Sequence, residues 1–323
     1  LFLKSDTTAV IKKQKHRFLS GIRGNEALFL MLLPGTIILL INNYLPMFGV
    51  VIAFKKYRLY NNFFESLIKS EWVGFKNFEF FFKTPYAFNV TRNTLLYNIV
   101  FIALDLIIPV ALAIILNELR SKKLSKTYQS VMFLPYFLSW IVVSYLAFSF
   151  FSMDKGFINT QILGSLGIEP VNWYSETAAW PFILTFFHLW KYTGYNVVVY
   201  VASLAGIDAE YYEAAALDGA TKWQQIKHIT IPMLQPIMII MTLLAVGRIF
   251  NADFGLFYNV TKNSGTIASV TEVLDTYVYK ALRNSNNMGM TAAAGLYQSV
   301  VGCITVFCAN LVVRKIDEDK ALF

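Results

Sequence analysis

The sequence has little charge for its length. Only 15% of the 323 residues are Asp, Glu, Lys or Arg, whereas soluble domains carry roughly 25%. Apolar residues make up 56% of the chain, more than the interior of an ordinary soluble protein would be expected to bury. This shortage of charge argues against a soluble globular fold, and no nucleic-acid partner is expected.

Side chains that hold metals or act as nucleophiles are also scarce. The two cysteines, Cys303 and Cys308, are five residues apart and fit no metal or redox spacing. The three histidines form no HExxH pair, and no nucleophile with a base is recognisable. None of the 17 glycines is followed by Lys, which excludes a GxxxxGK(S/T) phosphate loop. We therefore expect no enzymatic activity, metal or cofactor on this chain, and any dependence on ATP would come from a partner.

Long apolar runs are what the sequence has in abundance. Six blocks reach about twenty residues or more, the length that crosses a bilayer core of about 30 Å. Lipid offers the backbone no hydrogen-bond partners, so these blocks should be helices. The first block is too long for a signal-peptide core, so no cleavable signal is expected. The sequence predicts an all-α polytopic membrane protein with six transmembrane helices, at 27–54, 93–117, 128–152, 180–204, 234–254 and 292–313.

The distribution of Lys and Arg predicts the orientation in the membrane, because cytoplasmic loops carry the excess. With the N-terminus inside, the cytoplasmic segments hold 15 of these cations and the longer outer segments hold 11. The run KKQKHR (12–17) before the first block favours the same orientation. Both termini are thus expected in the cytoplasm, with cytoplasmic segments 1–26, 118–127, 205–233 and 314–323, and outer segments 55–92, 153–179 and 255–291.

A polar segment interrupts the apolar runs at 205–233. Asp208 is placed to cap a short helix, AEYYEAAAL, and Gly219 to end it in the left-handed conformation. Thr221 with Gln224 fits a capping box for a second helix, TKWQQIKHI, and Pro232 is expected at its boundary. The segment therefore predicts a helix–turn–helix along the membrane surface. The pattern alone is equally compatible with a docking element and with an interfacial helix that has no partner.

The same segment resembles the EAA motif, EAA-x3-G-x9-I-x-L-P, of permease subunits of bacterial binding-protein-dependent ABC importers. The one departure is Ile231, where Leu is usual. The resemblance implies that this loop is the coupling helix, which docks in a cleft of a cytoplasmic ATPase subunit. The residues that it assigns to coupling are Glu213, Ala214, Ala215, Asp218, Gly219, Ile229 and Pro232.

The resemblance extends over nearly the whole chain. GVVIAFKKY (49–57), EWVGFKNFEFFF (71–82), 116–140 and HLWKYTGYN (188–196) are similar to the branch of carbohydrate permeases that imports oligosaccharides and polysaccharide fragments. It implies a type I importer permease fold in the bacterial cytoplasmic (inner) membrane, with residues 27–313 as the transmembrane domain. The implied partners are a second, related permease, two ATPase subunits that bind ATP and Mg, an extracytoplasmic solute-binding protein and an oligosaccharide.

Four charged residues lie inside the predicted spans: Asp105, Lys191, Arg248 and Asp253. Such residues are costly in lipid and usually face the bundle interior. In one interpretation Asp105 or Asp253 forms a structural ion pair with one of the cations. In the other, the cations face the cavity and bind an anionic substrate. The candidate substrate path comprises Lys191, Arg248, Trp190, Tyr195, Asn196, Asn251 and Asp253.

The outer segment 55–92 carries seven cations and three acidic residues, a basic mouth that would attract an anionic sugar or the acidic rim of a binding protein. Uronate oligosaccharides are therefore a candidate cargo, and the resemblance to polysaccharide permeases suggests alginate. A different class, an ion-coupled secondary sugar transporter with Asp105 as the ion site, is the alternative, although it gives the EAA segment no role. We also expect a short surface helix at 74–82 and a bend in the first block near Asn42, Asn43 and Pro46.

Overall fold

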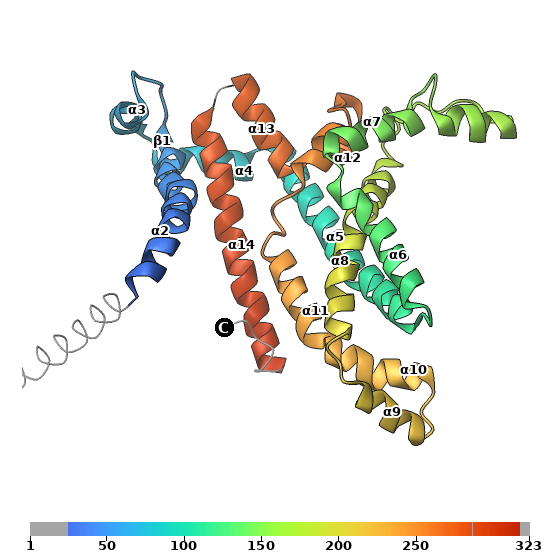
Figure 1. The fold of residues 1–323 in the computed structure, drawn as a ribbon. Coiled ribbons are helices and arrows are strands. Elements are labelled where there is room, and N and C mark those ends of the chain that lie inside the picture. The colour runs from blue at the N-terminus through green and yellow to red at the C-terminus, as the bar shows by residue number, and fades with distance from the viewer. Residues whose placement is uncertain (1–24, 286, 317–323) are drawn as a thin grey trace, which may run out of the picture.

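The computed structural model describes residues 25–285 and 287–316. Within these residues the protein is almost entirely helical, and its single two-stranded sheet pairs β1 (Lys55–Lys56) antiparallel with β2 (Glu71–Trp72). Figure 1 shows long helices running between two ends of the molecule. The principal helices are α2 (Glu26–Leu39), α3 (Phe63–Lys69), α4 (Glu79–Lys83), α5 (Pro85–Glu118), α6 (Lys122–Phe133), α7 (Trp140–Phe151), α8 (Trp180–Leu204), α9 (Ala209–Leu217), α10 (Lys222–Gln225), α11 (Ile231–Val246), α12 (Ala268–Thr271), α13 (Leu274–Ser285) and α14 (Met288–Ile316).

Short 3-10 and π-helical turns connect or extend these helices. They often mark places where a proline or a tertiary contact disturbs the regular α-helical hydrogen bonds. These turns are η1 (Leu40–Tyr44), η2 (Leu45–Phe54), η3 (Gly74–Phe78), η4 (Leu134–Phe137), η5 (Ile158–Leu163), η6 (Gly164–Leu166), η7 (Ile226–Thr230), η8 (Leu256–Val260) and η9 (Gly265–Ile267).

Every predicted apolar block contains a helix. Among the described residues, Glu26–Phe54, Pro85–Glu118, Lys222–Val246 and Met288–Lys315 are long and apolar enough to cross a membrane, and the bent pair α6–α7 makes a fifth if it counts as one span. The 25-residue helix α8 is long enough, but it falls outside this set. Polar and aromatic side chains such as His188 and Lys191 lower its hydropathy. The all-α polytopic fold is confirmed.

Helix α8 is central to the packing. It lies against α5 and α6, and its buried residues belong to the two largest apolar clusters of the described chain. Gly194 allows the closest approach, because a Cβ atom there would lie only 1.9 Å from the Met132 carbonyl oxygen. Side chains larger than hydrogen at position 194 would therefore force α6 and α8 apart.

Two of the predicted spans are not continuous helices. The block 128–152 bends by 98° between η4 and α7, beside Pro135. The block 234–254 loses its α-helix at Val246, well before the predicted end. The first block stays helical, but it changes to π and 3-10 geometry at η1 and η2, where a bend was expected. The predicted surface helix at 74–82 is formed by η3 followed by α4.

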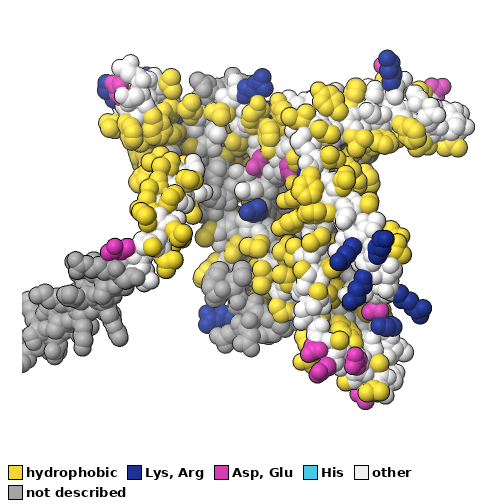
Figure 2. Space-filling view, in the orientation of Figure 1, with side chains coloured by type: hydrophobic (Ala, Val, Ile, Leu, Met, Phe, Trp, Pro, Cys, Tyr) yellow, Lys and Arg dark blue, Asp and Glu magenta, His cyan; other side chains and the backbone are white. Residues whose placement is uncertain are grey.

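The two ends of the molecule differ in character. Figure 1 places α9 and α10 at one end, and α3, α7, α12 and α13 at the other. Figure 2 shows apolar side chains over the region between them, Lys and Arg side chains gathered beside α6, and Asp and Glu side chains on the α9–α10 tip. This distribution is typical of a protein that crosses a bilayer and exposes charge on both sides.

Candidate functional site

The helix–turn–helix at one end of the molecule is built by its own sequence. The Asp208 carboxylate accepts a hydrogen bond from the Glu210 amide at 3.1 Å and caps α9. Gly219 follows α9 with φ +79°, in the left-handed region that glycine adopts without strain. Thr221 and Gln224 form the predicted capping box, in which the Thr221 amide donates to the Gln224 side chain at 2.7 Å. Each of these contacts spans at most three residues, so the loop shape depends little on the rest of the protein.

The predicted helix boundary at Pro232 is wrong. The helix that starts at Lys222 continues to Val246, with Pro232 in the first turn of α11. Proline lacks an N–H and its ring crowds the carbonyl four residues earlier. The π-helical turn η7, immediately before α11, opens the helix at this point, so the chain passes the proline without stopping. The loop is therefore joined to the apolar part of α11 by continuous helix.

Most of the motif residues are at the surface of this loop. Glu213, Ala214, Asp218, Gly219 and Pro232 are exposed, whereas Ala215 and Ile229 are half-buried. The apolar side chains at the tip are unusually open: Leu217 is 90% exposed and Trp223 is 70% exposed. An exposed pair of large apolar side chains on a rigid turn is the pattern of a protein-docking surface.

Two contacts connect the loop to the helices of the bundle. Lys222 forms an ion pair with Glu118 at the end of α5, at 3.0 Å. The hydroxyl of Tyr212 is 3.1 Å from that of Thr230, which fixes α9 against the start of α11. Force applied to the exposed tip would therefore reach both α5 and α11.

Lys191 is buried in α8, and its hydrogen bonds are to backbone carbonyls rather than to a carboxylate. Its ammonium group donates to the carbonyl oxygens of Tyr136, at 3.0 Å, and Leu138, and it lies 5.2 Å from the centre of the Trp140 ring. No carboxylate of the described residues forms an ion pair with it. The carbonyls that it binds are those left without helical partners where the chain bends between η4 and α7. Lys191 thus acts here as a cap for a broken helix.

Asp105 pairs with a histidine that the sequence interpretations did not assign to it. His188 Nε2 lies 2.9 Å from Asp105 Oδ2, and the His188 ring stacks on Phe101 at 3.8 Å. Asp105 also lines a cavity of about 90 Å³ together with Asn196, Tyr200 and Thr242. Of the predicted path residues, only Asn196 is on this cavity.

The unwound stretch between α11 and η8 contains three more predicted path residues. Arg248 and Asn251 are exposed, and among the described residues no side chain pairs with the Arg248 guanidinium. Asp253 accepts hydrogen bonds from Trp140 Nε1 at 2.8 Å and from the Tyr192 hydroxyl at 2.6 Å. Asp253 therefore joins the two broken spans to α8, close to where Lys191 holds the other break.

Three polar side chains that the sequence reasoning did not select hold the unwound backbone. Asn98 donates to the carbonyls of Ile249 and Asn251, and Gln298 donates to that of Phe250. The Asp275 carboxylate accepts from the Ala252 amide at 2.7 Å. Irregular backbone between transmembrane helices is tolerated only when protein or water satisfies it in this way. Asn98 and Gln298 could have been selected from the sequence, because each places an amide side chain inside an apolar block.

The aromatic path candidates lie on different sides of α8. Trp190 packs on the buried apolar cluster around Phe187, at 6.3 Å between ring centres. Tyr195 is 40% exposed and stacks on Tyr136 at 4.9 Å. The structure thus brings Lys191 and Asp253 close to one another through Trp140, while Trp190, Tyr195 and Asn196 point to separate surroundings.

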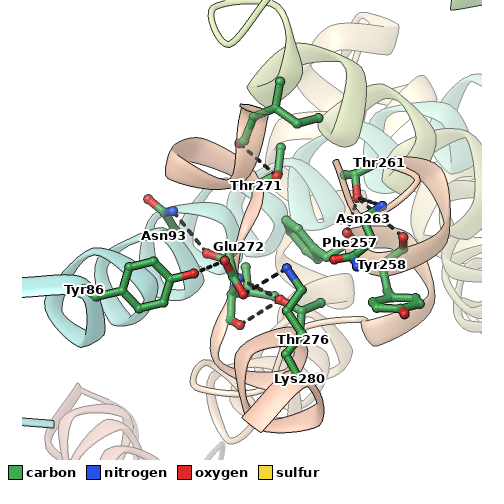
Figure 3. Close-up of polar contacts among 12 residues, drawn as sticks. Tyr86, Asn93, Phe257, Tyr258, Thr261, Asn263, Thr271, Glu272, Thr276 and Lys280 are labelled. Carbon is green, nitrogen blue, oxygen red and sulfur yellow. Dashed lines mark hydrogen bonds and ion pairs between the residues drawn. The ribbon is translucent and has the colours of Figure 1, made fainter. Parts of the chain in front are cut away.

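The end opposite the helix–turn–helix has a buried polar cluster of its own. Glu272, only 4% exposed, forms an ion pair with Lys280 at 3.1 Å and accepts a hydrogen bond from Tyr86 of α5 (Figure 3). Asn93 donates to the Glu272 carbonyl at 3.1 Å. The contacts of Glu272 fix α12 and α13 against α5.

The Asp275 carboxyl lies on α13, one turn before Tyr279. Burial raises the pKa of this carboxyl above its usual range.

The fold and these sites are those of a membrane transport subunit. Residues 109–318, more than half of the chain, match the family of binding-protein-dependent transport system inner membrane components, and the chain belongs to this family. Protein LplB of Bacillus subtilis (strain 168) is 35% identical over 320 residues, which cover 98% of this chain and 97% of that protein. The polygalacturonan/rhamnogalacturonan transport system permease protein YteP of the same organism is 32% identical, over 97% of this chain and 96% of YteP.

The solved structures agree. A permease chain from a bacterial ABC transporter involved in the import of the acidic polysaccharide alginate superposes with a TM-score of 0.83 at 29% identity, and the match covers 93% of this chain and 99% of that one. A chain of the bacterial alginate ABC transporter in complex with its alginate pentasaccharide-bound periplasmic protein gives a TM-score of 0.82.

Family membership defines the role of the chain. It is a multi-pass permease of the bacterial inner membrane, in an ABC importer of oligo- or polysaccharides. It is not itself catalytic, and ATP is bound by a separate ATPase subunit. A partner permease and an extracytoplasmic binding protein complete such a system. The ion-coupled secondary transporter considered from the sequence is therefore wrong, because this family is driven by ATP.

Proposed function

We propose that this permease forms half of the import path for acidic, alginate-like oligosaccharides. The observation that carries the proposal is Arg248. Its guanidinium is exposed at the break after α11 and has no partner among the described residues. An unpaired cation on a translocation path would offset the charge of a carboxylate sugar during passage. The similar transporter described as importing acidic alginate, and YteP with its galacturonate polymer, support the same cargo class.

The path would use the surroundings of Arg248 rather than all predicted residues. Asn251 is exposed three residues later and supplies hydrogen-bonding groups for sugar hydroxyls. Asn196 lines the cavity beside Asp105 and stays a candidate. Lys191 already binds backbone carbonyls, and Asp253 already binds Trp140 and Tyr192. These two residues would therefore shape the path without binding the cargo.

We further propose that the segment 208–232 docks on the ATPase through its exposed tip. In this arrangement the α9–α10 end and both chain termini lie in the cytoplasm, and the α13 end lies outside. The docked side chains would be Leu217 and Trp223, surrounded by the motif residues Glu213, Asp218 and Gly219. Motion of the ATPase would pass through the continuous helix 222–246 and the Lys222–Glu118 pair to the broken spans.

The cargo is tested by transport in proteoliposomes that contain the complete complex and its binding protein. We expect uronate oligosaccharides to stimulate ATP hydrolysis and to be taken up, and neutral oligosaccharides of equal length to do so less. Arg248→Gln should lower uronate uptake about tenfold, the order expected for losing a charge-assisted hydrogen bond of roughly 1.5 kcal/mol, whereas Arg248→Lys should keep most of it. Equal stimulation of ATP hydrolysis by neutral and acidic sugars would contradict the proposal that the cargo is acidic.

The docking is tested separately by Glu213→Lys, with Glu210→Lys as the matched control. Both glutamates are exposed on α9, but only Glu213 belongs to the motif. We expect Glu213→Lys to abolish ATPase stimulation by the loaded binding protein, and Glu210→Lys to retain it. Unchanged stimulation in Glu213→Lys would show that the loop docks in another way.

A further inference from the structure

Three aromatic rings meet at the outer end of the unwound stretch, and we name Phe254, Tyr258 and Tyr279 the outer aromatic cluster. The Phe254 and Tyr258 rings stack at 4.9 Å with an interplanar angle of 15°. Tyr279 of α13 meets both rings at steeper angles, at 4.9 and 5.2 Å. All three side chains are half-buried, so each keeps part of its surface open. The cluster therefore offers flat ring surface next to the proposed path.

Arg283 lies at the edge of this cluster. Its guanidinium is exposed and donates to the Tyr279 hydroxyl at 3.3 Å. No carboxylate of the described residues forms an ion pair with Arg283. Its neighbour on the helix, Lys280, is instead neutralised by Glu272. Arg283 thus contacts the hydroxyls of Tyr279 and Tyr258, but its exposed guanidinium has no charged partner among the described residues and can still bind an anion from solution.

The position of Arg283 is fixed by α13. Asp275, Tyr279 and Arg283 are spaced four residues apart and share one face of the helix. Asp275 binds the Ala252 amide of the unwound stretch, so this face starts at the break and runs outward. Lys280, on another face, is tied through Glu272 to Tyr86 of α5 (Figure 3). The rings and the guanidinium are therefore held by a rigid support before any ligand arrives.

We propose that the outer aromatic cluster and Arg283 form a subsite that receives a uronate residue of the cargo at the outer mouth. The C–H groups of a sugar pack on the electron-rich faces of aromatic rings. A carboxylate on the same sugar ring would take two parallel hydrogen bonds from the planar guanidinium. A neutral sugar would gain only the first interaction. This inference rests on the proposed acidic cargo.

The experiment is uptake by the complete complex in proteoliposomes, measured against the concentration of uronate-loaded binding protein. Uronate uptake by the wild-type complex tests the proposed function. A wild-type complex that takes up no uronate would refute both the acidic cargo and the subsite. Given uptake, Arg283→Gln should lower the maximal rate three- to fivefold, the range of an exposed ion pair. The apparent affinity for the loaded binding protein should stay within twofold, and Arg283→Lys should be intermediate.

The matched control is Lys155→Gln, which removes another exposed cation at the same end of the molecule. It should behave as wild type. An equal loss of rate in Lys155→Gln would assign the effect to general outer charge. A weakened apparent affinity in Arg283→Gln, at an unchanged maximal rate, would assign Arg283 to docking of the binding protein. No change in either quantity would also overturn the subsite.

A second measurement does not depend on turnover. In the assembled complex in nanodiscs, without binding protein, aromatic protons are irradiated and magnetisation transfer to the ring protons of a uronate tetrasaccharide is recorded by NMR. We expect transfer in wild type and a loss of at least half of it in Tyr258→Leu. Tyr174→Leu, in an aromatic group away from α13, is the control. Equal transfer in both variants would place the sugar elsewhere.

Discussion

The helix–turn–helix at 208–230 and the unwound stretch at 247–253 are built in opposite ways. The first is shaped by contacts between residues at most a few positions apart, such as Thr221 with Gln224. The second is held by side chains from distant elements, including Asn98, which is 151 residues before Ile249 in the sequence. A locally encoded element keeps its shape while it moves as a unit. A segment held by distant partners changes shape when those partners move.

The largest effect on transport is expected at the turn of the helix–turn–helix, where the backbone has no alternative conformation. Gly219→Val places a β-branched residue at φ +79°, where even a simple L-residue costs roughly 1–2 kcal/mol. No atom lies within 4 Å of the added Cβ, so the strain is in the backbone alone. We expect transport to fall more than tenfold while the complex still assembles, because the exposed tip would be presented differently to the ATPase.

The control for this change is Gly265→Ala, a glycine that also has open space around it but no left-handed backbone. Transport should stay near the wild-type rate in this variant. Normal transport by Gly219→Val would mean that the turn tolerates another geometry, and the proposed rigidity of the loop would then be wrong.

A smaller effect is expected in the part that depends on distant contacts. Lys191→Met keeps the apolar stem but leaves the carbonyls of Tyr136 and Leu138 without their donor. Buried polar groups that lose a partner cost about 1–3 kcal/mol each, so thermal unfolding of the solubilised complex should shift down by several degrees. Uptake of acidic and neutral sugars should decline together. A selective loss of acidic uptake with unchanged unfolding would instead put Lys191 on the cargo path.

Asp253→Asn tests the other half of the same junction. The amide oxygen can still accept from both Trp140 and Tyr192, which share Oδ2, but the charge that strengthens both bonds is gone, and an NH2 group replaces the Oδ1 acceptor of Gly255 and Leu256. We expect a destabilisation of about 1 kcal/mol, less than for Lys191→Met, measured by the same unfolding experiment. Asp253→Ala should cost more, because Trp140 and Tyr192 then lose their acceptor as well. Equal effects of Asn and Ala would show that these hydrogen bonds contribute little.

The same contrast explains how much the sequence could predict. The six blocks and the all-α fold follow from length and composition, which act on each segment separately. The caps at Asp208 and Thr221 and the turn at Gly219 were predictable because their partners are neighbours in the sequence. The break after Val246 was not, because it depends on Asn98 and Gln298. The partner of Lys191 was missed for a related reason: a bent helix exposes carbonyls, and carbonyls carry no sequence signal.

The smallest expected effect is a pH dependence at the outer end. Burial raises the pKa of Asp275, so the folded protein binds this proton more tightly than the unfolded chain. The stability contributed by the protonated form is therefore lost as pH rises from the ordinary Asp value, about 3.9, through the raised value. Asp275→Asn should be more stable than wild type at neutral pH, since the amide oxygen still accepts from Ala252 without a buried charge.

Glu79 supplies a control of opposite sign. Lys83 lowers the pKa of this exposed carboxyl by hydrogen bonding, so its contribution is lost as pH falls. Unfolding of Asp275→Asn and Glu79→Gln between pH 4 and 8 should therefore deviate from wild type in opposite directions, with Glu79→Gln the weaker because it is exposed. If Asp275→Asn is less stable at neutral pH, the carboxylate is ionised and needed by the unwound stretch. The charge would then be part of what holds the distant contacts together, and the contrast with the self-contained loop would become sharper.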